Sequence, residues 1–341
     1  MDLGKFSQRA LNERDAAGYI ALARAIGEAD EDPEYPDEAG FRELLHDPLT
    51  DRDLGDFTGL FDGERLVGYG RLICRSGADP VHWMITRGGV HPDYRGLGLG
   101  TALVRWIQEL APQVHERRYP GRPLEVSLGT VEANTAAHEL FRNEGFTPLR
   151  WFLDMRRPEG APIGPDQAPQ GLEFAPYNDL PGEALRLLHN EAFADHFRFV
   201  PQTVQSWTAW TGRDAFRKDL SFLLRDERTA EPAGYLAASV SEAEFAATGV
   251  RDVHFNLIGT RPAYRRRGVA TALIAHAVHA SRRLDFQTAT LSLDAQNPTG
   301  ALGVYEKSGF ECIHKFQAYR KQLSGVPAAA ETAAETEAEA G

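Results

Sequence analysis

Apolar residues along the chain follow two spacings, one typical of strands and one typical of helices. Short apolar runs predict β-strands at residues 5–10, 124–128, 172–176 and 288–293. Apolar residues three or four positions apart predict helices at about 13–28 and 180–194. The same spacing predicts two further helices, one with Leu99, Leu103, Ile107 and Leu110 and the other with Val269, Leu273 and Ala277. Such a mixture of strands and helices around a central sheet predicts an α/β fold.

The same order of elements occurs twice because the sequence itself repeats. Residues 88–110 match residues 257–280, and both segments contain Pro-x-Tyr-Arg followed by glycine and an apolar helix. Residues 128–146 match residues 291–310, with one extra residue in the second copy. In each copy we expect a three-strand meander, the long helix, a strand, a short helix and two last strands. We infer that one domain has been duplicated.

A proline- and glycine-rich segment separates the two copies. Residues 158–171 read PEGAPIGPDQAPQG, which has neither helix nor strand periodicity and is typical of a linker. We therefore expect domains at residues 1–157 and 172–323. The last residues, 324–341, hold four glutamates and no basic residue, and after Val326 they lack large apolar side chains, so we expect a disordered acidic tail.

Composition narrows the function classes. Of the 341 residues, 42% are apolar and 25% are charged, and no run approaches a membrane span. Two cysteines, Cys74 and Cys312, cannot build a disulfide framework or a cysteine-rich zinc site. The net charge of −12 disfavours binding to a nucleic-acid backbone. The first residues lack the pattern of a signal peptide. We expect a cytoplasmic protein, a monomer or homodimer, with no metal, nucleic-acid or membrane partner.

The segment that joins the meander to the long helix carries the candidate chemistry. Residues 95–100 (RGLGLG) and 265–270 (RRRGVA) both fit Arg-x-x-Gly-x-Gly/Ala. Small residues let the backbone approach a ligand, and the helix that follows presents unpaired N–H groups to it, which suits a pyrophosphate. A glycine-rich turn that merely links strand to helix fits the same residues. A dinucleotide-binding fingerprint and a P-loop do not fit, because their defining residues are missing.

This loop, together with an asparagine and a closing Gly-Phe pair farther along, resembles the GNAT family of acetyl-CoA-dependent N-acetyltransferases. The asparagines are Asn134 and Asn297, and the pairs lie at residues 145–146 and 309–310. Two copies cover nearly the whole chain. The resemblance implies two tandem domains, each with a mixed, mostly antiparallel sheet flanked by helices, the first degenerate and the second catalytic.

The resemblance also implies where acetyl-CoA binds as a co-substrate. In the family the loop amides hold the pyrophosphate, a bulged strand before the loop holds the pantetheine arm and acetyl group, and the asparagine touches the arm. These residues are Gly88, Gly89, Val90, Arg95, Gly96, Gly98, Gly100, Thr101 and Asn134 in the first copy, and Ile258, Gly259, Thr260, Arg265, Arg266, Arg267, Gly268, Val269, Ala270, Thr271 and Asn297 in the second. The arginines also fit a solvated charge run, and the asparagines fit helix N-caps.

The resemblance implies an acid and a base for the reaction. In many members a tyrosine four residues before the Gly-Phe pair protonates the leaving thiolate; Tyr305 stands there in the second copy, and Phe141 in the first. Family members often place a basic glutamate on the central strand, where this chain has His254. Asp294 is a second candidate base. Packing in the core is an alternative role for both Tyr305 and His254.

The acceptor is expected to contact the early helices. Residues 190–210 are dense in aromatics and resemble the acceptor-side segment of the mycothiol synthase family, in which two repeats also occur. The candidate contacts are Glu191, Asp195, His196 and Trp207. An amphipathic helix with buried Phe193 and Phe197 is a simpler interpretation of the same segment.

Three functions remain open at this stage. The first is an N-acetyltransferase that acts on a primary amine of a small molecule, such as an amino sugar, a polyamine, an amino acid or a thiol conjugate. The second is an enzyme that acetylates protein lysines or N-termini. The third is a non-catalytic acyl-CoA-binding scaffold, a role that the first copy fits because its acid position holds a phenylalanine.

Overall fold

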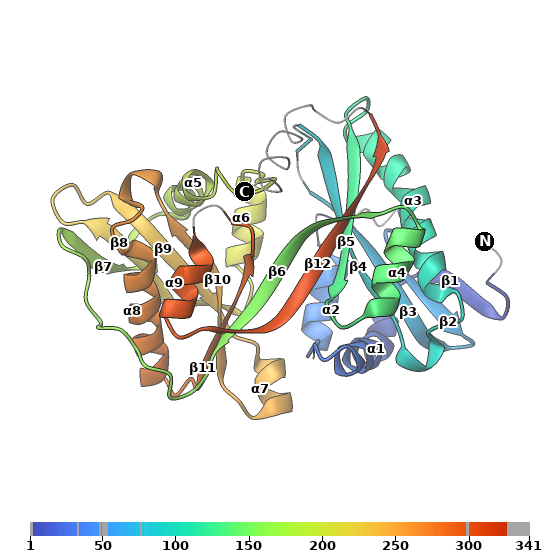
Figure 1. The fold of residues 1–341 in the computed structure, drawn as a ribbon, viewed down its shortest axis with the longest axis horizontal. Coiled ribbons are helices and arrows are strands. Elements are labelled where there is room, and N and C mark those ends of the chain that lie inside the picture. Colours follow the sequence, from blue (N-terminus) through green and yellow to red (C-terminus); the bar gives the residue numbers. More distant parts are fainter. Residues whose placement is uncertain are drawn as a thin grey trace, which may run out of the picture. The chain divides into compact units, whose positions relative to one another are not determined.

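The computed structural model describes residues 3–32, 34–47, 49, 54–75, 77–78, 80–297 and 300–325. The chain forms two compact units (Figure 1). One comprises residues 1–150 and 316–341, and the other residues 151–315. All but the first two residues of the expected acidic tail lie outside the described residues.

Among its described residues, the first unit contains strands that pair in one sheet and four α-helices. Its strands are β1 (Phe6–Ala10), β2 (Phe57–Asp62), β3 (Arg65–Cys74), β4 (His82–Val90) and β5 (Leu124–Val131), and its helices are α1 (Ala16–Ala29), α2 (Glu38–Leu45), α3 (Leu99–Arg118) and α4 (Thr135–Asn143). The strands follow in the order β1-β2-β3-β4-β5-β12, where β12 spans Glu311–Ser324. Within the described residues of this unit β4 and β5 run parallel, whereas β1–β2, β2–β3, β3–β4 and β5–β12 are antiparallel.

The second unit repeats this plan. Its strands are β6 (Thr147–Arg157), β7 (Leu172–Pro176), β8 (Phe216–Asp226), β9 (Pro232–Ser239), β10 (Asp252–Thr260) and β11 (Thr288–Asp294), and its helices are α5 (Gly182–Ala192), α6 (Val204–Thr211), α7 (Glu242–Thr248), α8 (Val269–Arg283) and α9 (Ala301–Lys307). The order is β7-β8-β9-β10-β11-β6, with β10 and β11 parallel. The predicted mixed, mostly antiparallel α/β fold is confirmed.

The last strands differ from the prediction. A single long strand closes each copy instead of two short ones, and its far part joins the sheet of the other unit. Residues 152–157 of β6 pair with β11, and residues 316–324 of β12 pair with β5. Residues 151–157 therefore belong to the second unit and 316–323 to the first, unlike the boundaries at 157 and 323 that the sequence suggested. Apolar alternation shows which face of a strand is buried, but it does not identify the strand's partner.

Helices cover both faces of each sheet. In the first unit α3 and α4 pack on one face around Val104, Ile107 and Phe141, and α1 and α2 pack on the other around Tyr19 and Phe41. In the second unit α8 takes the place of α3, and α5 and α6 cover the opposite face. The predicted apolar positions of α3, at residues 99, 103, 107 and 110, are all buried, as helical periodicity requires.

The predicted linker contains no helix or strand, and it packs along α8. Asp166 pairs with His276 Nδ1 at 2.6 Å, and the Gly164 carbonyl lies 3.0 Å from His279 Nε2. Helix α7, between β9 and β10, was not predicted from the sequence. Within the described residues, no helix combines the length and the apolar character that crossing a membrane requires.

Candidate active sites

Each unit has a place where two parallel strands stop pairing. The β4–β5 ladder runs from His82–Leu124 to Ile85–Ser127 and ends there. The β10–β11 ladder ends at the equivalent pair, His254–Thr290. Beyond these pairs β4 and β10 remain hydrogen-bonded only to β3 and β9. Their other edges are therefore available to a ligand in the region of each glycine loop.

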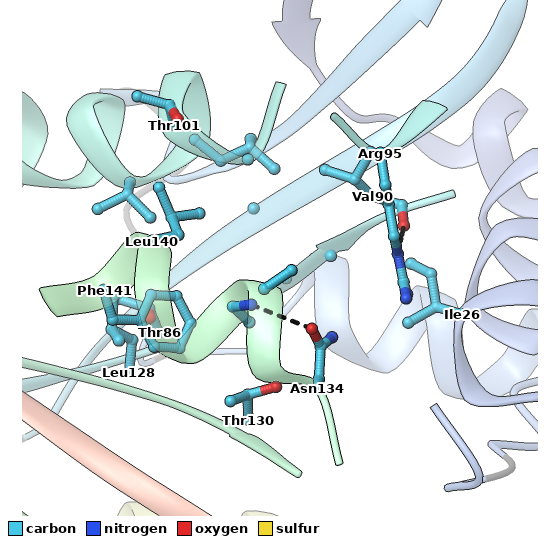
Figure 2. Close-up of a pocket in the computed structure, with 18 of the residues that line it drawn as sticks. Ile26, Thr86, Val90, Arg95, Thr101, Leu128, Thr130, Asn134, Leu140 and Phe141 are labelled. Carbon is cyan, nitrogen blue, oxygen red and sulfur yellow. Dashed lines mark hydrogen bonds between the residues drawn. The ribbon is translucent and has the colours of Figure 1, made fainter. Parts of the chain in front are cut away.

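In the first unit this region is a cavity of about 470 Å³ (Figure 2). All nine first-copy residues proposed to bind acetyl-CoA line it. Figure 2 shows Leu128, Leu140 and Phe141 together at one end and Arg95 beside Ile26 at the other. An apolar cleft that ends at a glycine loop suits a long ligand whose phosphates meet the loop.

The glycine loops have the backbone geometry of an anion site. Gly96 and Gly98 have positive φ angles of 76° and 82°, and a Cβ added at either would meet nothing within 4 Å. Helices α3 and α8 begin directly after Gly98 and Gly268, and neither has a side-chain cap at its N-terminus. The first N–H groups of both helices therefore need a partner from outside the helix, and a pyrophosphate supplies oxygen acceptors.

The first arginine of each loop is held within the protein. Arg95 makes a bidentate ion pair with Asp30 at 2.8 and 2.9 Å, and Arg265 pairs with Asp195 at 2.6 Å. In both units this contact ties the loop to the end of the first helix or to the residues just after it. Phosphate contact by these two guanidinium groups, one of the roles considered for them, would compete with a carboxylate.

The asparagines lie next to those ion pairs. Asn134 caps α4 through Ala137 N and also donates to Asp30 Oδ1 at 3.2 Å. Asn297 Nδ2 lies 3.5 Å from His196 Nε2. Asn134 therefore serves as the N-cap of α4 and also lines the cavity.

The expected strand bulge is present in one copy only. The β9–β10 register shifts between Phe255 and Leu257, just before the proposed contacts Ile258, Gly259 and Thr260. The β3–β4 register shows no shift from Gly68–Val90 to Cys74–Met84, so the bulge expected before Gly88 is absent. In the bulge, Asn256 Oδ1 is buried and has no partner within the described part of the chain. No sequence motif singled out Asn256, whose side-chain oxygen can accept a hydrogen bond from a ligand N–H.

The candidate acid lies on α9. Tyr305 packs against the core of the second unit, with its ring 6.3 Å from that of Phe310. Burial raises the pKa of Tyr305 to about 12, so the phenol keeps its proton at neutral pH. Its first-copy counterpart, Phe141, lines the cavity and has no proton to give.

The candidate base lies on β10 at the end of the parallel ladder. His254 Nδ1 is 3.0 Å from Thr290 Oγ1, which donates to Asp252 Oδ2 at 2.6 Å. Burial lowers the pKa of His254, partly offset by the charges of Asp252 and Asp154, so the ring is neutral at pH 7 as a base must be. The ladder places Ile85 at the equivalent position of the first copy. Asp294, the second candidate base, ends β11.

All four proposed acceptor contacts are engaged within the second unit, His196 by Asn297 and by the ring of Phe193. Glu191 binds Arg261 at 2.9 Å, Asp195 binds Arg265, and Trp207 is buried among His189 and Trp210. His196 has a lowered pKa, mainly through burial and then through Arg265. Trp207 is thus a buried aromatic residue of α6. The simpler interpretation, a helix with Phe193 and Phe197 buried, is wrong for those two residues, because α5 ends at Ala192 and both rings are only half-buried.

Comparison with known proteins identifies the same two segments. Residues 22–146 and 183–310 match the model of the acetyltransferase (GNAT) family. A mycothiol acetyltransferase from Thermobispora bispora is 27% identical to the chain, over 87% of this chain and 92% of that protein. A mycothiol acetyltransferase from Acidothermus cellulolyticus is 30% identical, over 73% of this chain and 74% of the relative.

Solved structures show the same fold. A GCN5-related N-acetyltransferase from Sphaerobacter thermophilus superimposes with a TM-score of 0.77 at 24% identity, covering 95% of this chain and 98% of that one. A tandem GNAT protein from the clavulanic acid biosynthesis pathway superimposes with a TM-score of 0.70 at 16% identity, covering 94% of this chain and all of that one.

Proposed function

Because the chain belongs to the GNAT family of acetyltransferases, we propose that it moves the acetyl group of acetyl-CoA to a primary amine of a small molecule, and that the second repeat does the chemistry. One observation carries the choice of repeat. The second repeat has an ionisable group at both proposed catalytic positions, His254 and Tyr305, whereas the first has Ile85 and Phe141 there. A repeat without either group has no side chain at these positions to move the protons of the reaction.

The residues of the second repeat supply the two proton transfers. When bound, acetyl-CoA provides a thioester carbonyl that an uncharged amine can attack. An alkyl ammonium has a pKa of about 10, so a proton must first leave it. His254 is neutral at pH 7 and can accept that proton. Tyr305 keeps its proton and can give it to the thiolate that leaves.

We assign the first repeat to acetyl-CoA binding without turnover. Its cavity has the glycine loop, the uncapped helix start and apolar lining residues from β5, α3 and α4. These groups hold a phosphate and an acyl-pantetheine arm but move no proton.

The relatives guide the choice of acceptor. Proteins named mycothiol acetyltransferase align over most of this chain, so we propose an acceptor amine of the kind that such enzymes acetylate. The assay would offer purified protein acetyl-CoA with desacetylmycothiol, glucosamine, spermidine or a lysine-containing peptide, and detect the acetylated product by mass spectrometry. Acetylation of the peptide alone would contradict a small-molecule acceptor.

Two glycine substitutions test which repeat works. Gly268→Glu puts a carboxylate at the phosphate end of the second site, and Gly98→Glu does the same in the first. We expect each to remove one acetyl-CoA site in calorimetric titration, and Gly268→Glu alone to abolish turnover. Gly268→Ala and Gly98→Ala are the matched controls, since they share the positive-φ strain without the added charge.

The opposite pattern would reassign the chemistry. If Gly98→Glu abolishes product formation while Gly268→Glu does not, the working site lies in the first repeat. If acetyl-CoA produces no heat with the wild-type protein and none of the amines is acetylated, the proposed reaction is wrong.

A further inference from the structure

The candidate base is joined to a short hydrogen-bond chain that crosses from β10 to β11 and back. His254 Nδ1 lies 3.0 Å from Thr290 Oγ1, and Thr290 Oγ1 donates to Asp252 Oδ2 at 2.6 Å. Thr288 Oγ1 donates to the other oxygen, Asp252 Oδ1, at 2.5 Å. The parallel register produces this arrangement, because it pairs Asp252 with Thr288 and His254 with Thr290.

The chemistry of the groups fixes the direction of each hydrogen bond. A carboxylate only accepts, so the hydroxyl hydrogen of Thr290 is committed to Asp252. Thr290 Oγ1 then has only lone pairs to offer His254, and the neutral ring must carry its hydrogen on Nδ1. The other nitrogen, Nε2, holds the lone pair, and no hydrogen bond to it is present among the described residues.

We propose that Thr290 and Asp252 are positioning residues, which hold His254 as the Nδ1–H tautomer so that Nε2 is the atom that takes the proton from the acceptor amine. This rests on the proposed function, in which His254 is the base. The bond that forms is Nε2–H and the bond that breaks is an N–H of the ammonium group. Asp252, linked through Thr290, stabilises the positive ring that results.

The charged groups around His254 support this role. Asp252 on the same strand and Asp154 on β6 both favour the protonated ring, while Ser239, its partner on β9, is uncharged. Asp252 also faces Glu244 of α7, which lies near Arg156. Of these carboxylates, Asp252 is connected to the His254 ring through the hydroxyl of Thr290.

The first repeat lacks the whole arrangement and provides a control. Its equivalent ladder pair is Ile85 and Ser127, and Ile85 has no ring to orient. Ser127 is buried at a position that matches Thr290. Ser127→Ala therefore removes a buried hydroxyl from the same ladder position without touching His254.

The tautomer can be measured without any acceptor. Nitrogen-15 labelling of the histidine rings distinguishes Nδ1–H from Nε2–H by NMR, and the signals missing in His254→Gln identify this residue. We expect a single Nδ1–H form in wild type and in Ser127→Ala. Thr290→Val has nearly the same shape but no hydroxyl, and we expect it to show a mixture of both tautomers. A persistent single Nδ1–H form in Thr290→Val would overturn the proposal.

The pH profile of kcat/KM, recorded with the best acceptor of the panel, separates the roles of the two residues. Thr290→Val should lower kcat about tenfold, because the ring loses the hydrogen bond that selects its tautomer and links it to Asp252. Asp252→Asn removes a charge that raises the pKa of His254. The acid limb of its profile should therefore move to lower pH by about one unit. Wild-type rates and profiles in both variants would contradict a positioning role.

The His254→Gln variant distinguishes failure of the proposed function from failure of the positioning role. If His254→Gln acetylates the acceptor at the wild-type rate, His254 is not the base, whatever its tautomer. If His254→Gln is inactive but Thr290→Val keeps both the wild-type profile and the Nδ1–H form, the base assignment stands and the positioning role is wrong.

Discussion

His82 and His115 form a buried pair whose rings meet through their Nδ1 atoms. His115 Nε2 donates to the Arg122 carbonyl at 2.8 Å, and in the neutral ring its Nδ1 then accepts from His82 Nδ1, also at 2.8 Å. Burial, followed by the charge of His115, lowers the pKa of His82 to about 4. In the second unit burial likewise lowers the pKa of His189 to about 4. The Nδ1 atom of His189 lies 2.6 Å from Tyr235 Oη.

These two histidines should make the fold sensitive to acid. In the unfolded chain each titrates near 6.5, so between pH 6.5 and 4 the unfolded state binds protons that the folded state does not. Stability is therefore full above pH 6.5 and falls as the pH drops through this window, by up to about 3 kcal/mol for each histidine. Thermal unfolding between pH 7.5 and 4.5 measures the effect. His82→Leu should flatten the slope, and the exposed His46→Gln should not; equal slopes in all three proteins would contradict the assignment.

The Tyr305 hydroxyl can be tested on its own. Tyr305→Phe removes the proton donor and keeps the ring that packs near Phe310. We expect kcat to fall by about 10² or more with little change in acetyl-CoA affinity, because one proton transfer loses its acid. Phe141→Tyr, which restores the hydroxyl in the first repeat, should leave kcat unchanged because Ile85 supplies no base there. Wild-type kcat in Tyr305→Phe would place the acid elsewhere.

At the scale of elements, the two glycine loops share one backbone path despite different residues. Gly96 has a φ of 76°, and its counterpart in the second loop, Arg266, has a φ of 60°. A non-glycine residue in this left-handed region costs about 1 kcal/mol. The second loop thus adopts the same backbone conformation as the first although this conformation is sterically unfavourable for Arg266. Such strain is expected where the loop amides must point at a ligand.

That cost predicts a stabilising substitution. Arg266→Gly should raise the free energy of unfolding by up to about 1 kcal/mol, since glycine adopts the same φ without a steric penalty. Arg267→Gly is the matched control, because Arg267 does not have a positive φ and glycine there should destabilise. Chemical denaturation with urea measures both. A loss of stability in Arg266→Gly as large as in Arg267→Gly would contradict the strain.

At the scale of the molecule, the exchanged last strands make each unit depend on distant parts of the chain. Tyr319, in β12, is fully buried in the core that contains Phe141, and its hydroxyl lies 2.8 Å from His138 Nδ1. Tyr319 therefore packs behind Phe141, which lines the first cavity.

Truncating that side chain should damage the first site selectively. Tyr319→Ala removes a buried aromatic ring and should cost about 3–5 kcal/mol of stability. We expect calorimetry to show one acetyl-CoA site lost while turnover in the second repeat continues. Ile313→Ala, at an exposed position of the same strand within the second unit, is the control. Loss of turnover with both acetyl-CoA sites retained would contradict this dependence.

Four features can be predicted without any structure: the duplication, the α/β class, the glycine loops and the contrast between Tyr305 and Phe141. Each is a local pattern or a comparison of two local patterns. Three features depend on contacts between distant segments: the strands that β6 and β12 pair with, the ion pairs that hold Arg95 and Arg265, and the placement of Thr290 and Asp252 beside His254. These are pairings between distant segments. Strand register and chain exchange create them, and periodicity along one segment carries no information about its partner.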